Sequence, residues 1–345
     1  MFTFIYSFYS TDTIENINPA IPFITSGNLK IYTMNIYEEI PSIFTIKIQG
    51  TYINNNNTFI DGFSLSNTNG YYSSNSSNPN LHKFTIIQFG GAPLSRSGNQ
   101  FENLFNTQLT ILATDAPTIL NNTSLESCFS KCYNFNSDIS NFDTYEVINM
   151  SNMFNDAILF NNGSTSNNGA NQLTLTASAS LTKINNMFQN ASAFNQTLVN
   201  FTNTSNVTDM SNMFNGASVF NNGSNQLTFI TSSTLTNISG MFQGATNFNQ
   251  SLTFTNTLSV TDMSYMFNNA ISFTNYGTQL NFITTNVTNM NYMFAGNLSN
   301  TTPFNQDFNQ NLDYWRDNSS PSYTNFNQYG SIIDANLPSW MIKDW

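Results

Sequence analysis

Few side chains in this sequence have the type and spacing that could perform chemistry. The two cysteines, Cys128 and Cys132, are four residues apart, and the single histidine is His82. A zinc site takes about four ligands, so two cysteines supply only half of one, and we expect both in the core. His82 lies in a strand-like stretch with no serine or cysteine motif nearby, which does not support a catalytic triad. We therefore predict no catalytic residue, no metal and no cofactor.

One pair of carboxylates also invites a catalytic interpretation. Asp209 and Asp262 occupy equivalent positions of a repeat, two copies apart, and Asn149, Asn237 and Asn289 fill the same position in other copies. In a stack of copies the two carboxylates would be about 10 Å or more apart. A glycosidase needs two carboxylates that face each other across a cleft. Capping the N-terminus of a short helix explains them better.

The charge balance excludes several classes of partner. Charged residues make up 8% of the chain, the net charge is −11, and only eight residues are Lys or Arg. Nucleic-acid binding needs clustered basic side chains, so we expect no nucleic acid. No apolar run approaches the ~20 residues of a transmembrane segment. The first ten residues have no basic region or small-residue cleavage site, so we expect no signal peptide.

The chain is organised by a repeat built around a Met-Phe pair, clearest between Val207 and Phe220. Measured from the Phe, there is an aliphatic residue at −7, Met or Ile at −4, Met at −1, Ala at +3 and a second Phe at +6. Copies centre on Phe129, Phe154, Phe188, Phe214, Phe242, Phe267 and Phe294. A spacing of about 27 residues is typical of stacked repeat proteins.

The spacing of apolar residues predicts the fold class. Val207, Met210 and Phe214 fall on one side of a helix with 3.6 residues per turn, and the segment Gln226–Phe229 suits a short strand. We predict an α/β repeat solenoid. It would be a leucine-rich-repeat-like stack of short helices and parallel strands, with the Phe and Met side chains in continuous internal ladders.

Four regions follow from this pattern. Residues 1–85 form a β-rich N-terminal domain or cap, with strands expected at 29–34 and 42–53 because their residues alternate. Residues 86–123 are a degenerate repeat or connector. Residues 124–312 are the solenoid of about seven copies, and residues 313–345 are a C-terminal cap that contains all three Trp.

The candidate interaction residues lie in longer turns and in the C-terminal tail. Every second copy continues after its second Phe as Asn-Asn-Gly or a related turn, which indicates duplication of a pair of repeats. Loops on a rigid scaffold commonly bind partners, and Trp is frequent at interface hot spots. The candidates are Asn161, Asn162, Gly163, Asn221, Asn222, Gly223, Tyr276, Trp315, Trp340 and Trp345.

The string Val207-Thr-Asp-Met-Ser-Asn-Met-Phe214, followed by Ala217 and Phe220, resembles the repeat of BspA-like leucine-rich-repeat surface proteins. It is most similar to the DUF285 group of mycoplasmas, other bacteria and some large DNA viruses. The resemblance covers about residues 124–312. It implies surface exposure and a role in attachment or protein interaction, and it carries over no catalytic residue. The missing secretion signal and residues 1–123 depart from the family pattern.

Three functional hypotheses remain. The first is a non-enzymatic surface protein of a cell or virus particle that binds a protein or glycan on a host surface. The second is a structural virion component, at the capsid surface or as a minor capsid protein, docked onto neighbouring subunits through the N-terminal β region and the C-terminal tail. A weaker third class is an enzyme or an ice-binding protein, motivated by Thr-X-Thr pairs such as Thr174 and Thr176.

Overall fold

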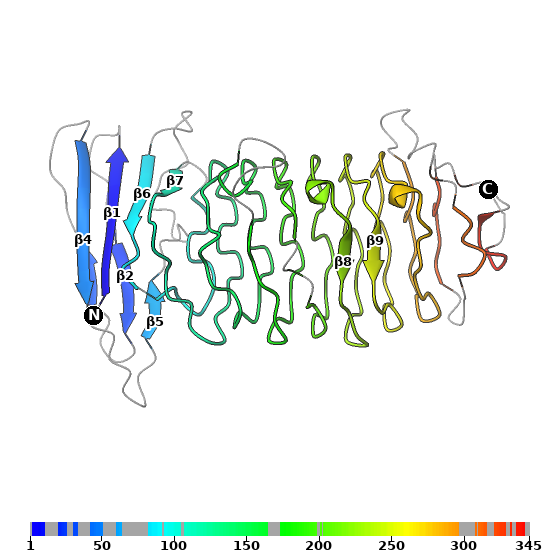
Figure 1. Cartoon of the computed structure of the whole chain (residues 1–345), viewed down its shortest axis with the longest axis horizontal. Helices are drawn as coiled ribbons and strands as arrows, with labels where there is room; N and C mark the ends of the chain where they lie inside the picture. Colours follow the sequence, from blue (N-terminus) through cyan, green and yellow to red (C-terminus); the bar gives the residue numbers. More distant parts are fainter. Residues whose placement is uncertain are drawn as a thin grey trace.

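The computed structural model is elongated, with strands at the N-terminal end and a long row of stacked coils that continues to the C-terminal end (Figure 1). It describes residues 2–10, 20–25, 30–33, 42–50, 60–63, 82–91, 93–104, 107–164, 173–198, 201, 203–296, 308, 310–315, 321–328, 332 and 336–341. Side chains are described from residue 84 onward. We call each repeat a coil and identify it by the Phe of its Met-Phe pair.

The N-terminal strands form two sheets. The strands described before the stack are β1 (Phe2–Ser10), β2 (Ala20–Thr25), β3 (Lys30–Thr33), β4 (Ser42–Gly50), β5 (Ile60–Phe63) and β6 (His82–Gln88). One sheet has the order β4-β1-β6-β7 and the other the order β3-β2-β5. The segments 29–34 and 42–53, predicted as strands, contain β3 and β4.

Strand β6 begins the parallel pairing that continues along the stack. It pairs in parallel with β7 (Thr107–Ile111). A series of isolated parallel bridges then joins equivalent residues of consecutive coils: Ser97, Ser124, Asn149, Lys183, Asp209, Asn237, Asp262, Asn289 and Ser322. The short strands β8 (Leu227–Phe229) and β9 (Leu252–Phe254) pair in the same register. The copies therefore stack one upon another.

The predicted helix in each copy is wrong. The helical elements with described bounds are the three-residue 3₁₀ turns η2 (Asn222–Ser224) and η3 (Asn275–Gly277). Strand pairs in the stack are also short, so the chain is not a solenoid of helix–strand repeats. Most of each coil consists of turns. The Met-Phe segment shows what replaces the helix.

Backbone N–H groups of the Met-Phe segment alternate between two kinds of acceptor. The N–H groups of Asn152 and Phe154 donate to carbonyl oxygens of the next coil, at 3.0 and 2.8 Å. The N–H groups of Met153 and Ala157 donate to the residue three positions earlier, at 3.2 and 3.0 Å. An α-helix would need bonds to the fourth residue back. The segment is thus a chain of three-residue turns bonded to its neighbours.

The turns depend on two positions in each coil with a left-handed backbone. The first lies two residues before the Phe, with φ between 53° and 59°, and it holds Asn99, Ser127, Asn152, Asn186, Asn212, Gly240, Tyr265 and Tyr292. The second lies two residues after it and holds Asn103, Lys131, Asp156, Asn190, Gly216, Gly244 and Asn269. Asn and Gly tolerate this conformation best, and it cannot occur inside a right-handed helix.

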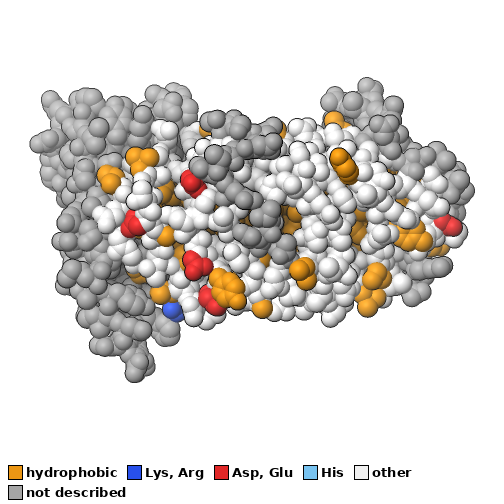
Figure 2. Space-filling view, viewed as in Figure 1, with side chains coloured by type: hydrophobic (Ala, Val, Ile, Leu, Met, Phe, Trp, Pro, Cys, Tyr) orange, Lys and Arg blue, Asp and Glu red, His pale blue; other side chains and the backbone are white. Residues whose placement is uncertain are grey.

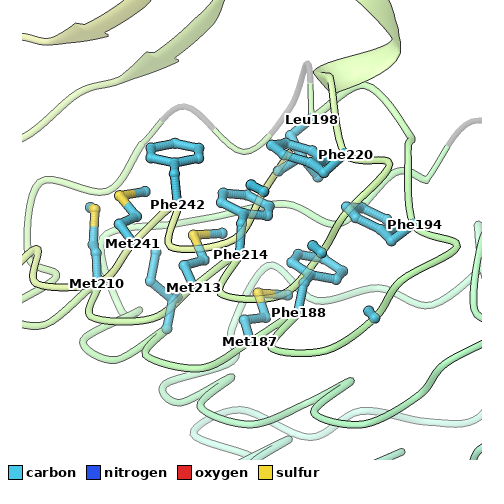
Figure 3. Close-up of a cluster of buried hydrophobic side chains, with 14 of the residues drawn as sticks. Met187, Phe188, Phe194, Leu198, Met210, Met213, Phe214, Phe220, Met241 and Phe242 are labelled. Carbon is cyan, nitrogen blue, oxygen red and sulfur yellow. The ribbon is translucent and has the colours of Figure 1, made fainter. Parts of the chain in front are cut away.

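The core contains two parallel columns of phenyl rings. The Phe of each Met-Phe pair stacks on its equivalent in the next coil, with ring centroids 5.7 Å apart for Phe188 and Phe214 and 5.4 Å for Phe214 and Phe242. The second Phe forms the other column, and within a coil the two rings stack closely, at 3.9 Å for Phe214 and Phe220. Figure 3 shows the Met-Phe pairs of three coils one above another. The expected internal ladders are confirmed.

Candidate functional site

An asparagine follows the second Phe in five consecutive coils and links each coil to the next. These residues are Asn136, Asn161, Asn195, Asn221 and Asn249. The Oδ1 atom of Asn161 accepts the backbone N–H of Asn195 at 3.0 Å, and Oδ1 of Asn195 accepts that of Asn221 at 2.7 Å. The same contact recurs at the other three. We call this series the asparagine column.

A second asparagine follows in the coils with longer turns, and it reaches in the opposite direction. Asn162, Asn222 and Asn275 are buried and have a left-handed backbone. Their Oδ1 atoms accept backbone N–H groups of the preceding coil, from Ile139 at 3.0 Å, Leu198 at 2.9 Å and Leu252 at 2.7 Å. These side chains satisfy buried donors, which would otherwise destabilise the fold.

The glycines of two longer turns donate to the asparagine column, and packing around Gly223 is close. The N–H of Gly163 donates to Oδ1 of Asn136 at 2.9 Å, and that of Gly223 donates to Oδ1 of Asn195 at 3.2 Å. A Cβ on Gly223 would lie 2.2 Å from Oγ1 of Thr197.

The six predicted contact residues of the longer turns thus hold coils together. The side chains of Asn161, Asn162 and Asn222 are buried, so they are not available to a partner; Gly163 is exposed, and Asn221 and Gly223 are half-buried.

Among the described aromatic residues of the predicted set, Tyr276 is the most exposed. Its side chain is 70% exposed, and its backbone has φ of 51°. The N–H of Tyr276 donates to Oδ1 of Asn249 at 3.3 Å, which anchors the turn to the preceding coil. Its predicted contact with a partner stays a prediction.

The tryptophans differ in their exposure. Trp315 is 1% exposed and stacks on Phe282 with ring centroids 6.0 Å apart, so it extends the core. Trp340 is half-buried; its indole N–H donates to the carbonyl of Trp315 at 2.9 Å, and its ring meets Tyr323 edge-on. Trp345 lies outside the described residues. Trp315 is therefore not a surface contact.

The two thiols are core groups. Cys128 and Cys132 are buried and free, and they occupy the positions held by Met and Ala in other coils. Burial raises the pKa of Cys132 to about 12, and burial followed by the neighbouring Cys132 raises the pKa of Cys128 well above its usual range. In the described part of the chain no three His, Cys, Asp or Glu residues are grouped as metal ligands would be.

The two carboxylates stand apart, as expected, but they do not cap helices. Asp209 and Asp262 are separated along the stack by Asn237, which bridges to both. Oδ1 of Asp209 accepts the N–H of Ser211 at 2.9 Å, and Oδ1 of Asp262 accepts that of Ser264 at 2.8 Å. These are local side-chain turns, which Asp and Asn favour. The helix-cap interpretation is corrected accordingly.

An exposed column of threonines was missed in the sequence. Its members are Thr182, Thr208, Thr236, Thr261 and Thr288. Each Oγ1 donates to the backbone carbonyl one coil earlier, at 3.0 to 3.4 Å. Thr174 and Thr176, considered for ice binding, are not part of it. The recurrence six residues before each Phe was a usable signal, obscured because other threonines are frequent.

A pair of tyrosines was also missed. Tyr265 and Tyr292 occupy the left-handed position before the Phe, where four other coils have Asn. Their rings stack with centroids 4.9 Å apart and an interplanar angle of 12°. Aligning the copies would have singled them out, because a bulky side chain is unusual at this backbone geometry.

Comparison with known proteins identifies the repeat. A family model described as "Mycoplasma protein of unknown function, DUF285" matches residues 99–222, 164–276 and 222–340, which together cover more than half of the chain. No curated protein and no solved structure matches. Within the described residues, no helix is long and apolar enough to cross a membrane.

Proposed function

Because the chain belongs to the DUF285 family, whose description assigns no activity, we propose that it is a non-enzymatic, surface-exposed repeat protein of a cell or virus particle. In this role it mediates attachment or protein–protein interaction. Its partner is a protein or glycan on a host surface. We also propose, on the match of the string from Val207 to Phe214, that the chain is related to the BspA-like leucine-rich-repeat surface proteins.

The observation that carries this proposal is that side chains inside the stack hold the coils together, whereas side chains outside it form a repeating polar surface. Inside, phenyl columns and the asparagine column fix every coil against its neighbours. Outside, short uncharged polar side chains recur once per coil, as in the threonine column, and the visible face carries few charges (Figure 2). A rigid scaffold with a repeating surface suits an extended, multivalent contact.

The ionisable groups support a role without catalysis. A nucleophilic cysteine needs a lowered pKa and an accessible sulfur, whereas Cys128 and Cys132 are buried with raised pKa values. Asp209 and Asp262 are two coils apart and each holds a local turn. These groups do not form the pairs that general acid–base chemistry uses.

Protease shaving tests the proposal. Intact cells or particles that carry the protein are treated briefly with a protease, and the released peptides are identified by mass spectrometry. We expect peptides from exposed turns such as the one with Tyr276, while an interior protein of the same cells or particles stays uncleaved. Release of this chain only after lysis would overturn the proposal.

A structural virion component is the second candidate, and one observation favours it. Among the described strands, β4 pairs with β1 alone and so borders its sheet. The open edge of a nine-residue strand can pair with a neighbouring subunit. Purified chains that stay monomeric, together with absence from purified particles, would contradict this alternative.

A further inference from the structure

We propose that Tyr265, Tyr292 and Asp262 form a binding site for a guanidinium or ammonium group of a basic partner segment. This inference rests on the proposed function, since it names a partner class for the same scaffold. It concerns a different part of the surface from the longer turns.

The first observation is the backbone of the two tyrosines. Tyr265 has φ of 56° and Tyr292 has φ of 57°, which are left-handed values that bulky side chains rarely adopt. Other coils place Asn99, Asn152, Asn186 and Asn212 at the same position with similar φ. The same backbone therefore forms with Asn, and the two tyrosines are not needed to make the turn. Strain retained at a site that the fold does not require indicates function.

The second observation is how the two rings are presented. Tyr265 is 40% exposed and stacks on the half-buried Tyr292, with centroids 4.9 Å apart. The pair lies at the surface rather than in the phenyl columns of the core. An exposed aromatic pair of this kind offers π-electron density to a cation, and guanidinium groups also stack on aromatic faces.

The third observation is a carboxylate that lies close to Tyr265 in the sequence. Asp262 lies three residues before Tyr265 on the same coil, and its Oδ2 accepts Nδ2 of Asn289, which lies three residues before Tyr292. Between residues 184 and 296 the only charged side chains in the sequence are Asp209 and Asp262. No cation of this segment neutralises Asp262. Asp262 accepts three hydrogen bonds, two at Oδ1 from Ser264 and one at Oδ2 from Asn289, and a carboxylate has about four acceptor sites, so Oδ2 can still accept a donor from a partner.

Charge complementarity selects the occupant. The chain has a net charge of −11 and eight basic residues. An acidic partner would be repelled, whereas Arg or Lys side chains would be attracted and could meet both the rings and the carboxylate. A neutral sugar could also stack on the rings, but it would leave the carboxylate uncompensated.

The test uses the full chain and a fluorescent octa-arginine peptide as the probe, with affinity measured by fluorescence anisotropy. The double variant Tyr265→Asn/Tyr292→Asn should bind about tenfold more weakly, and Asp262→Asn about threefold more weakly. The matched control is Tyr145→Asn, which removes another exposed tyrosine, and it should bind the peptide as the native chain does. A neutral oligosaccharide serves as the competing probe.

Thermal unfolding of the same variants adds a second readout. The double variant should unfold at an equal or higher temperature, because Asn relieves the backbone strain. Unchanged peptide binding, preferential binding of the oligosaccharide, or a lowered unfolding temperature would each overturn the proposal. Protease shaving reports exposure independently of peptide binding, so failure of this site and failure of the proposed function are distinguishable.

Discussion

Replacing Asn195 by Ala tests whether the asparagine column holds the coils together. Oδ1 of Asn195 accepts the backbone N–H of Asn221 at 2.7 Å and that of Gly223 at 3.2 Å. Removal of the amide leaves both donors without this acceptor. An unsatisfied buried donor costs roughly 1–3 kcal/mol. Because both donor residues are half-buried, we expect a loss near the lower end, about 2–3 kcal/mol in total.

Two measurements read out this change. Equilibrium unfolding in urea gives the free energy, and hydrogen exchange reports the two amides directly, which matters because long repeat arrays can depart from two-state unfolding. The control is Asn206→Ala. Asn206 is exposed and donates from Nδ2 to the carbonyl of Ala179 at 2.7 Å, so its loss should stay within about 0.5 kcal/mol. A loss below about 1 kcal/mol for Asn195→Ala, with unchanged exchange at residues 221 and 223, would refute the reasoning.

Further predictions concern the core and the turns. Phe214→Ala should lower the free energy of unfolding by about 3–5 kcal/mol in urea, because it interrupts both stacking along the column and stacking within the coil. Burial raises the pKa of Cys132 from 9.0 to about 12, so the stability that its protonated thiol contributes is complete below pH 9 and lost toward pH 12. Between pH 9 and pH 12 the melting temperature should fall less for Cys132→Ala, which has the Ala of other coils, than for the native chain. Equal falls in melting temperature for the two proteins would contradict the raised pKa of Cys132. Gly223→Ala should cost about 1–3 kcal/mol and more than Gly277→Ala, since a Cβ at Gly277 meets no atom within 4 Å; equal losses in urea would contradict the packing argument.

The repeat and its core could be predicted from the sequence, because a strict spacing of Phe, Met and Ala requires equivalent environments in every copy. Phe214 and Phe220 were expected in ladders and are fully buried in them. The same pattern does not fit the predicted helix. Apolar residues at 150, 153/154, 157 and 160 recur about every three residues, which fits turns closed by bonds to the third residue back.

The signal that should have excluded a helix is Asn or Gly at two fixed positions, such as Asn212 and Gly216. These residue types mark left-handed backbone, whereas a helix surface would favour Ala, Glu or Lys. The roles of the turn residues were harder to predict from the sequence than the absence of a helix. Asn162 and Asn222 belong to turns that look like surface loops, and only their hydrogen bonds to the preceding coil show that the side chains are internal.

The two types of coil are not interchangeable. In the shorter type, Nε2 of Gln196 and of Gln250 donates to the asparagine of the longer coil before it, at 2.9 and 3.0 Å. In the longer type, Asn222 receives the N–H of Leu198 from the shorter coil before it. Loss of a single coil would therefore join two like surfaces and leave one set of donors without acceptors. Homologues of different length should therefore differ by pairs of coils, and each pair adds about 10 Å to the length of the stack.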